Sequence, residues 1–312
     1  MVLNLNPFFV LEKSPDPKIA KNQLNRAASL CFASLKMASL VKREELPPDT
    51  FKGVPLCMDQ FKALFGSTRV PKGNGMKDCV HTYPDSTHVV VLIRNHIYYF
   101  QALWPQDSSV AVDEHDIKDI LDAIQKHVSV ISYPANAAEE NGQNPGKQNG
   151  VEIKNIPATS EEALGVLTSL PRAEWAEARR MIEEGDNEQN KKSLHVIDSA
   201  LFVLVLDDHY PKDINEKAAN MLHGTNELIM GPDNTLVQLG TCCNRWYDKL
   251  QLIVCSNGTA GVNFEHSAID GHTALRYVSD IFAETVVQFA QSITSLGKLY
   301  SMVHAISVGR DL

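Results

Sequence analysis

Apolar residues recur every three or four positions in several stretches of the chain, and this periodicity predicts helices. The first predicted helix lies over residues 16–43, with Asp16 or Ser14 as its cap. Further helices are predicted over 56–66, over 113–127 with Asp113 as the cap, and over 173–184, which carries Trp175. Residues 71–79, rich in Pro, Gly and Asn, predict a loop.

The longest helical pattern spans residues 272–296. It is amphipathic, with one stripe of large apolar side chains on the predicted helix. The stripe consists of Leu275, Val278, Phe282, Val286, Phe289 and Ile293.

Runs of β-branched and aromatic residues predict strands between these helices. Residues 88–100 predict two strands with a turn at Asn95 and His96, and 165–168 a short third strand. The apolar end of 193–206 suits a buried strand, although a helix that continues into a strand fits equally. Residues 250–265 predict a hairpin, because Asn257-Gly258 suits a turn in which both residues take φ > 0. Strands and helices alternate throughout, which favours an α/β or α+β fold, a mixed β-sheet layered with helices.

Two polar stretches interrupt this pattern. Residues 135–160 combine Asn, Gln, Gly, Lys and Glu with few large apolar groups, and we expect a mobile surface loop there. Residues 231–243 also predict a loop. Strands resume after 160 in the same pattern, so residues 135–160 do not predict a domain boundary.

Composition narrows the functional classes. The chain has 312 residues, 44% hydrophobic and 21% charged, which is typical of a globular protein with a sizeable core. Its net charge of −9 argues against a nucleic-acid partner, although a local pocket can still bind an anionic cofactor. No apolar run is long enough to predict a membrane span.

The six cysteines do not predict a metal site. They form no CxxC pair and no Cys/His group with zinc-ligand spacing, so free thiols are the simplest interpretation. The adjacent Cys242 and Cys243 are either reactive or buried and inert, and the residue pattern favours the second.

The candidate chemistry lies in the sequence EHSAIDG, residues 265–271, between a predicted strand and the long helix. His266 and Asp270 are four residues apart and would share a face if the segment turned helically. Histidine suits the abstraction of a proton from a weak nucleophile such as an alcohol or thiol. Gly271 would permit tight backbone geometry where a side chain would clash. The alternative is a helix start capped by Ser267 or Asp270, since the chain has eleven histidines.

The HxxxDG pattern at His266 resembles the signature of CoA-dependent acyltransferases, a group that includes chloramphenicol acetyltransferase. The wider sequence resembles the choline/carnitine acyltransferases, above all the carnitine acetyltransferases. The segment NRWYDKLQ at 244–251 is the most specific match after the histidine motif. The other matching segments follow in family order: NPFF at 6–9, RAAS at 26–29, LPP at 46–48, PLCMDQF at 55–61, RVP at 69–71, HVVV at 88–91, GVLT at 165–168 and 172–175.

The resemblance implies the reversible reaction acyl-CoA + carnitine ⇌ acyl-carnitine + CoA, with His266 as general base. It implies that Asp270 supports the site through an ion pair with Arg245, and that Trp246 and Tyr247 are core or wall residues. It implies acyl-CoA as a co-substrate, no permanently bound cofactor, a short acyl group such as acetyl, and a monomer in the full-length form. It also implies a mitochondrial or peroxisomal location, although the chain carries no readable targeting signal.

Family enzymes are roughly twice as long as this chain, so residues 1–288 correspond to the His-bearing half and 289–312 to the end of a helix and the start of the second half. That second half would supply a Ser-Thr-Ser motif for the oxyanion and much of the CoA surface; no Ser-Thr-Ser occurs here, and the CoA-binding residues stay unknown. An inactive homologue or binding module is therefore the main alternative. A peptide-synthetase condensation domain fits less well, because Glu265 stands where those domains usually have a second histidine.

Overall fold

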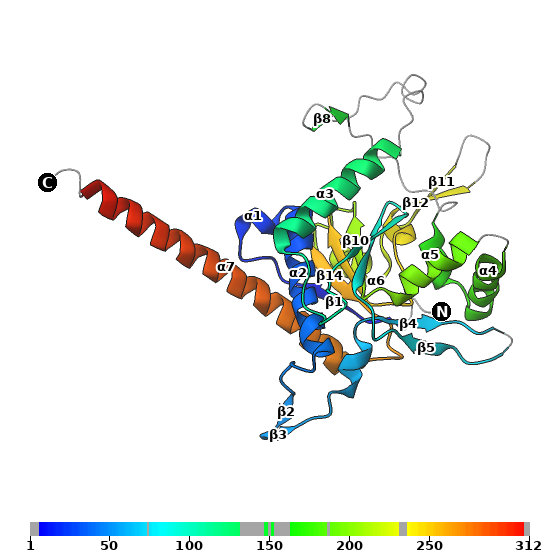
Figure 1. Ribbon diagram of the computed structural model, residues 1–312. Helices are drawn as coiled ribbons and strands as arrows, with labels where there is room; N and C mark the ends of the chain where they lie inside the picture. The colour runs from blue at the N-terminus through cyan, green and yellow to red at the C-terminus, as the bar shows by residue number, and fades with distance from the viewer. Residues whose placement is uncertain are drawn as a thin grey trace.

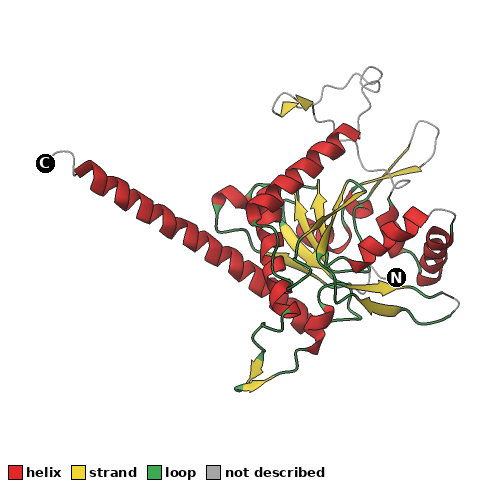
Figure 2. Ribbon diagram, in the orientation of Figure 1, coloured by secondary structure: helices red, strands yellow, loops and turns green. Residues whose placement is uncertain are grey.

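A computed structural model describes residues 6–73, 75–131, 147–148, 151–152, 163–185, 188–230 and 236–308. Its centre is a six-stranded sheet with helices on both faces (Figures 1 and 2). This confirms the predicted mixed sheet layered with helices. The loop expected over 135–160 lies outside the described residues except for β8 (Lys147–Gln148) and β9 (Val151–Glu152).

The strand order of the sheet is β1-β14-β13-β10-β6-β7. Its centre is parallel, because β10 (Val203–Asp207) runs parallel to both β13 (Gln251–Cys255) and β6 (His88–Ile93). The outer pairs are antiparallel hairpins or returns: β7 (His96–Gln101) on β6, β14 (Ala260–Asn263) on β13, and β1 (Phe8–Leu11) on β14. Burial on both sides explains why β10 is apolar at every position before Asp207.

Alternate strand residues feed two separate cores. On one face Val89, Val91 and Leu204 pack under α2 (Gln23–Lys42), α3 (Glu114–Ile131) and α7 (Gly271–Val308). On the other face Val90, Leu92 and Val205 pack with Trp175, Leu194 and Met221. Those last three residues belong to α4 (Arg172–Glu184), α5 (Glu188–Ser199) and α6 (Ile214–His223).

The remaining elements are short. They are α1 (Pro17–Ala20), the hairpins β2 (Thr50–Phe51) with β3 (Val54–Pro55), β4 (Ser67–Val70) with β5 (Cys79–Thr82), and β11 (Glu227–Met230) with β12 (Leu236–Leu239). The described residues also form the 3₁₀ helices η2 (Asp59–Ala63), η4 (Leu164–Ser169) and η5 (Thr241–Cys243). β12 corrects the prediction of a loop over 231–243, and η4 corrects the prediction of a strand over 165–168.

The helix predicted over 16–43 is broken into α1 and α2. Asp16 caps α1 as predicted, but Asn22 takes an extended conformation and caps α2 through the amide of Asn25. Gln23 then donates to the backbone carbonyls of Asp207 and Val254 at the end of the sheet. The break therefore lets the start of α2 contact strand ends, which no local periodicity reveals.

Both predicted hairpins of the main sheet form with turns that differ from the predictions. Arg94 and Asn95, with φ of 47° and 66°, make the β6–β7 turn one residue earlier than expected. In the β13–β14 turn only Gly258 has positive φ, 78°, and its amide donates to the Cys255 carbonyl. The turn is one residue longer than the predicted two-residue turn, and β14 still pairs with β13 in register.

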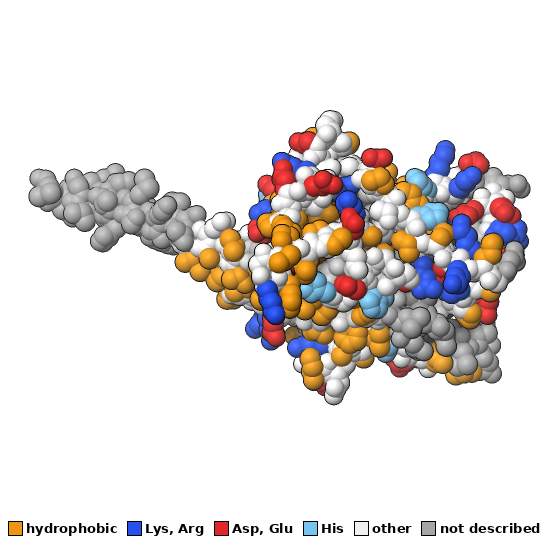
Figure 3. Space-filling view, turned by 90° about the horizontal axis from the view of Figure 1, so that it is seen from below, with side chains coloured by type: hydrophobic (Ala, Val, Ile, Leu, Met, Phe, Trp, Pro, Cys, Tyr) orange, Lys and Arg blue, Asp and Glu red, His pale blue; other side chains and the backbone are white. Residues whose placement is uncertain are grey.

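The helix α7 is 38 residues long and its C-terminal part projects away from the sheet (Figure 1). Its buried side consists of Ala274, Tyr277, Val278 and Ile281, so the predicted apolar stripe is only partly inward. Leu275, Val286 and Ile293 of that stripe are 49%, 40% and 53% exposed. Figure 3 shows hydrophobic side chains where this helix meets the body of the protein.

Candidate active site

His266 lies in a turn between β14 and α7, and its side chain is exposed. Its Nδ1 lies 2.7 Å from the carbonyl oxygen of Ile269. A carbonyl can only accept, so Nδ1 carries the hydrogen and the neutral ring presents an unprotonated Nε2. The ring also packs edge-on against Phe264, with centroids 5.8 Å apart. This geometry is that of an accessible base with a fixed ring orientation.

Glu265 attaches the start of this turn to the rest of the protein. Its carboxylate accepts the Ser267 amide at 2.8 Å and the Ser267 hydroxyl at 2.7 Å. It also accepts Arg69 Nη1, from β4, at 2.9 Å. The residues on both sides of His266 are thus tied to one buried carboxylate.

Asp270 attaches the end of the turn. Its carboxylate accepts the Thr273 amide at 3.0 Å, which makes it the cap of α7. Gln60 accepts the Asp270 amide at 2.9 Å and donates to its carboxylate at 3.4 Å. The Thr273 amide, more than any other group, lowers the pKa of Asp270. A Cβ on Gly271 would meet nothing within 4 Å, so the expected tight approach at this glycine is wrong.

A chain of half-buried ion pairs continues from Glu265 toward the core. Arg69 Nε donates to Asp78 at 2.8 Å, and Arg172 Nε donates to the same carboxylate at 2.6 Å. Arg172 Nη1 reaches Asp248 at 2.8 Å, and Trp175 donates to Asp248 at the same distance. Burial raises the pKa of Asp248 to about 6, although Arg172 opposes the rise.

Two hollows flank the His266 turn. One is narrow, about 20 Å³, and is lined by Leu64, Lys249, Glu265, Ala268 and Ile269 among others. The second, more open hollow is lined by Arg69, Asp78, Cys79, Arg172 and Ser267. Glu265, Ala268 and Ile269 thus line the first hollow and Ser267 the second, and the exposed imidazole between them does not lie in a sealed interior.

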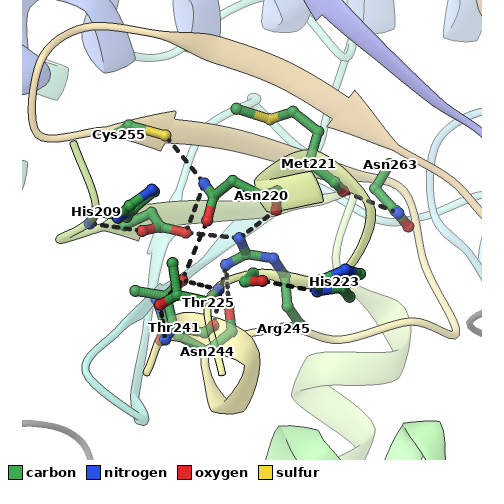
Figure 4. Close-up of polar contacts among 12 residues, drawn as sticks. His209, Asn220, Met221, His223, Thr225, Thr241, Asn244, Arg245, Cys255 and Asn263 are labelled. Carbon is green, nitrogen blue, oxygen red and sulfur yellow. Dashed lines mark hydrogen bonds and ion pairs between the residues drawn. The ribbon is translucent and has the colours of Figure 1, made fainter. Parts of the chain in front are cut away.

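Arg245 lies elsewhere, in a buried polar cluster (Figure 4). Its Nη2 donates to Asp207 at 2.6 Å and to the Asn220 carbonyl at 2.8 Å, and both members of the ion pair are 0% exposed. Asp207 pairs in register with Cys255, whereas Asn263, next to the His266 turn, pairs with Gln251 at the other end of β13. Four residues of strand separate those ends, roughly 13 Å.

The predicted ion pair between Arg245 and Asp270 is therefore wrong. Each of the two has other partners in the described part of the chain: Asp207 for Arg245, and Thr273 and Gln60 for Asp270. Trp246 and Tyr247 are buried, as expected of core residues. Sequence reasoning brought His266 and Asp270 into one turn correctly, but it misassigned the partners of Asp270 and of the distant Arg245.

Comparison with known proteins identifies the family of this chain. The family model described as Choline/Carnitine o-acyltransferase matches residues 1–302. The chain belongs to the choline/carnitine O-acyltransferase family. It is 35% identical to a putative mitochondrial carnitine O-acetyltransferase of Saccharomyces cerevisiae, over 94% of this chain and 42% of that protein. It is 30% identical to the mitochondrial carnitine O-palmitoyltransferase 2 of Mus musculus, over 91% of this chain and 40% of that protein.

This chain spans about two fifths of the length of these family members. Sequence reasoning missed the contacts of Gln60, Arg69, Asp78 and Glu265 around the histidine turn. A signal was present, because Gln60 and Arg69 fall in segments that carry the family resemblance and Glu265 adjoins the motif. Their joint contact with one turn depends on elements about 200 residues apart in sequence.

The structure also bears on the cysteines, on a metal site and on a membrane span. All six cysteines are free, with Cys243 buried and Cys242 partly so. Among the residues that the structure describes, no group of His, Cys, Asp or Glu is arranged to bind a metal ion. None of the described helices is both long and apolar enough to span a bilayer.

Proposed function

We propose that this chain is the His-bearing part of a carnitine O-acyltransferase, residues 1–288, which continues at 289–312 toward a second half. His266 acts as the general base for acyl transfer between CoA and carnitine. The single observation that supports this most is the hydrogen bond from His266 Nδ1 to the Ile269 carbonyl, because it leaves Nε2 free to accept a proton at the surface.

In this reaction Nε2 takes the hydroxyl proton of carnitine as the oxygen attacks the thioester carbonyl of acyl-CoA. The tetrahedral intermediate then expels the CoA thiolate, which recovers the proton from the imidazolium. The reverse reaction uses the same proton on the CoA thiol. A positioned base of this kind typically contributes about 10²–10⁴-fold in rate.

The other two site residues act indirectly in this proposal. Asp270 fixes the start of α7 and the end of the histidine turn, and Arg245 fixes the segment that leads into β13. Acyl-CoA is a co-substrate and no cofactor is permanently bound. We favour a short acyl group, acetyl, and a mitochondrial location, because the yeast relative is named a mitochondrial carnitine O-acetyltransferase. A monomer is the proposed state of the full-length protein.

The test measures CoA release from acetyl-CoA and carnitine, with the 312-residue chain and with the complete gene product. His266→Ala should lower kcat by about 10²–10⁴-fold. The matched control is His272→Ala, an exposed histidine that pairs with Asp49 outside the turn and should leave kcat close to that of the unchanged protein. Equal rates for the His266→Ala variant and the unchanged protein would refute the proposal.

Substrate binding distinguishes this proposal from the alternative, an inactive homologue. If calorimetry finds CoA and carnitine bound to the complete product without any turnover, the protein is a homologue that keeps the fold as a binding module. The CoA-release assay with palmitoyl-CoA in place of acetyl-CoA tests the preference for a short acyl group.

A further inference from the structure

Glu265 is a buried anion beside an exposed histidine. Its side chain is 8% exposed, yet every contact described for its carboxylate is with Arg69 or Ser267 and none is with the His266 ring. Burying a carboxylate is costly unless it is paired and hydrogen-bonded, so these contacts account for its position. They also attach the backbone amide immediately after His266 to a fixed point.

The fixed point is rigid because Arg69 is itself held on both sides. Its Nη1 donates to Glu265 and its Nε to Asp78. Asp78 is shared with Arg172, which extends the ion pairs to Asp248 and the buried Trp175. This series of ion pairs therefore connects the histidine turn to α4 and to the core that contains Trp175.

We propose that Glu265 is a positioning residue for His266, an inference that rests on the proposed function of that histidine. The Nδ1 hydrogen bond to Ile269 forms only while the backbone of 266–269 keeps its turn. Glu265 keeps that turn through Ser267, and so sets both the ring direction and the tautomer that exposes Nε2. Small misplacements of reacting groups cost up to about 10²-fold in rate, so the positioning of His266 by Glu265 should affect kcat more than substrate affinity.

A glutamine at this position has nearly the same shape but cannot replace the contacts. One carboxylate oxygen accepts Arg69 and the Ser267 hydroxyl, and the other accepts the Ser267 amide. An amide offers one oxygen and one NH₂, so whichever way it turns, two donors face each other. Glu265→Gln therefore loosens the turn without creating a cavity.

The direct test is ¹⁵N NMR of the histidine rings of the 312-residue chain in mildly alkaline buffer. His266→Ala identifies the His266 signals by their loss. In the unchanged chain the Nδ1–H tautomer should dominate, and in Glu265→Gln the nitrogen shifts should move toward the Nε2–H tautomer. The matched control is Glu284→Gln. It removes a different ion-paired glutamate, which lies on α7 and pairs with Lys36 of α2, and it should leave the His266 shifts unchanged.

Kinetics on an active gene product give the second measurement. Glu265→Gln should lower kcat by about 10–100-fold with little change in either KM. If His266→Ala is inactive while Glu265→Gln keeps full kcat and unchanged nitrogen shifts, the positioning role is overturned and the proposed function stands. If His266→Ala is fully active, the proposed function fails first.

Ser267→Ala guards against a Glu265→Gln variant that does not fold. It removes only the hydroxyl contact of an exposed residue, so the fold should persist. A smaller shift of the His266 signals in the same direction supports the positioning role. Unchanged signals in Ser267→Ala, when Glu265→Gln cannot be measured, overturn it.

Discussion

The ion pair between Arg245 and Asp207 gives a quantitative test of the structure, because neither side chain is exposed to solvent. Burial alone would lower the pKa of Arg245, but the groups around it, Asp207 foremost among them, together raise the pKa. Asp207→Asn keeps the size of the side chain and removes its charge. The arginine is then left as a buried cation without a counter-charge.

The expected cost follows from that burial. Removing one partner of a buried ion pair typically lowers the free energy of unfolding by about 3–5 kcal/mol. Arg245 keeps its bonds to the carbonyls of Asn220 and Asn244, which hold it in place but carry no full negative charge. Since whole domains are stable by only about 5–15 kcal/mol, the variant should fold and yet be clearly weakened.

Urea unfolding followed by tryptophan fluorescence measures this cost, because Trp246 is buried beside Arg245. The matched control is Asp208→Asn, one residue further along the chain. Asp208 pairs with Arg94 but is 41% exposed, so its loss should cost no more than about 1 kcal/mol.

The double variant Asp207→Asn with Arg245→Met completes the cycle. Removing the stranded cation should restore part of the stability that Asp207→Asn loses, since the penalty belongs to the unpaired charge. If Asp207→Asn is no less stable than Asp208→Asn, the buried pair is not present as described, and the account of Arg245 as a structural residue fails.

Two further changes test the packing and the electrostatics of the region around the site. Burial lowers the pKa of Lys249 to about 7, although Asp198 and Asp248 oppose this, so between about 7 and 10 the unfolded chain binds more protons than the folded one. The free energy of unfolding should therefore rise with pH in that window, by up to about 1.4 kcal/mol per pH unit, and Lys249→Met should abolish the rise. Urea unfolding at several pH values measures this, and the same dependence of the free energy of unfolding on pH in both proteins would contradict it. Gly165→Ala should lower the free energy of unfolding by about 1–3 kcal/mol, because the new Cβ would lie 2.1 Å from the Arg245 carbonyl oxygen, and Gly271→Ala, with open space around it, is the control in the same urea assay.

The sequence determined much of the secondary structure in this protein. The apolar run before Asp207 predicted a buried strand, and Asp16 and Asp113 predicted helix starts that the structure confirms. The hairpin at Gly258 and the long helix after it placed His266 between a strand and a helix. These features depend on periodicity, capping and turn geometry, which are properties of neighbouring residues.

Only the tertiary structure decided which side chains meet. Arg245 was expected to pair with Asp270, but the fold brings it to Asp207 at the far end of β13 and leaves Asp270 to cap α7 with Gln60. Glu265 meets Arg69, 196 positions away in sequence, because β4 lies against the end of the sheet. The inward face of α7 also followed from packing, since Leu275 and Val286 have helical periodicity but no partner layer in the described structure. Local pattern fixes which residues can form an element, whereas ion pairs and buried faces depend on the three-dimensional arrangement that brings distant elements together.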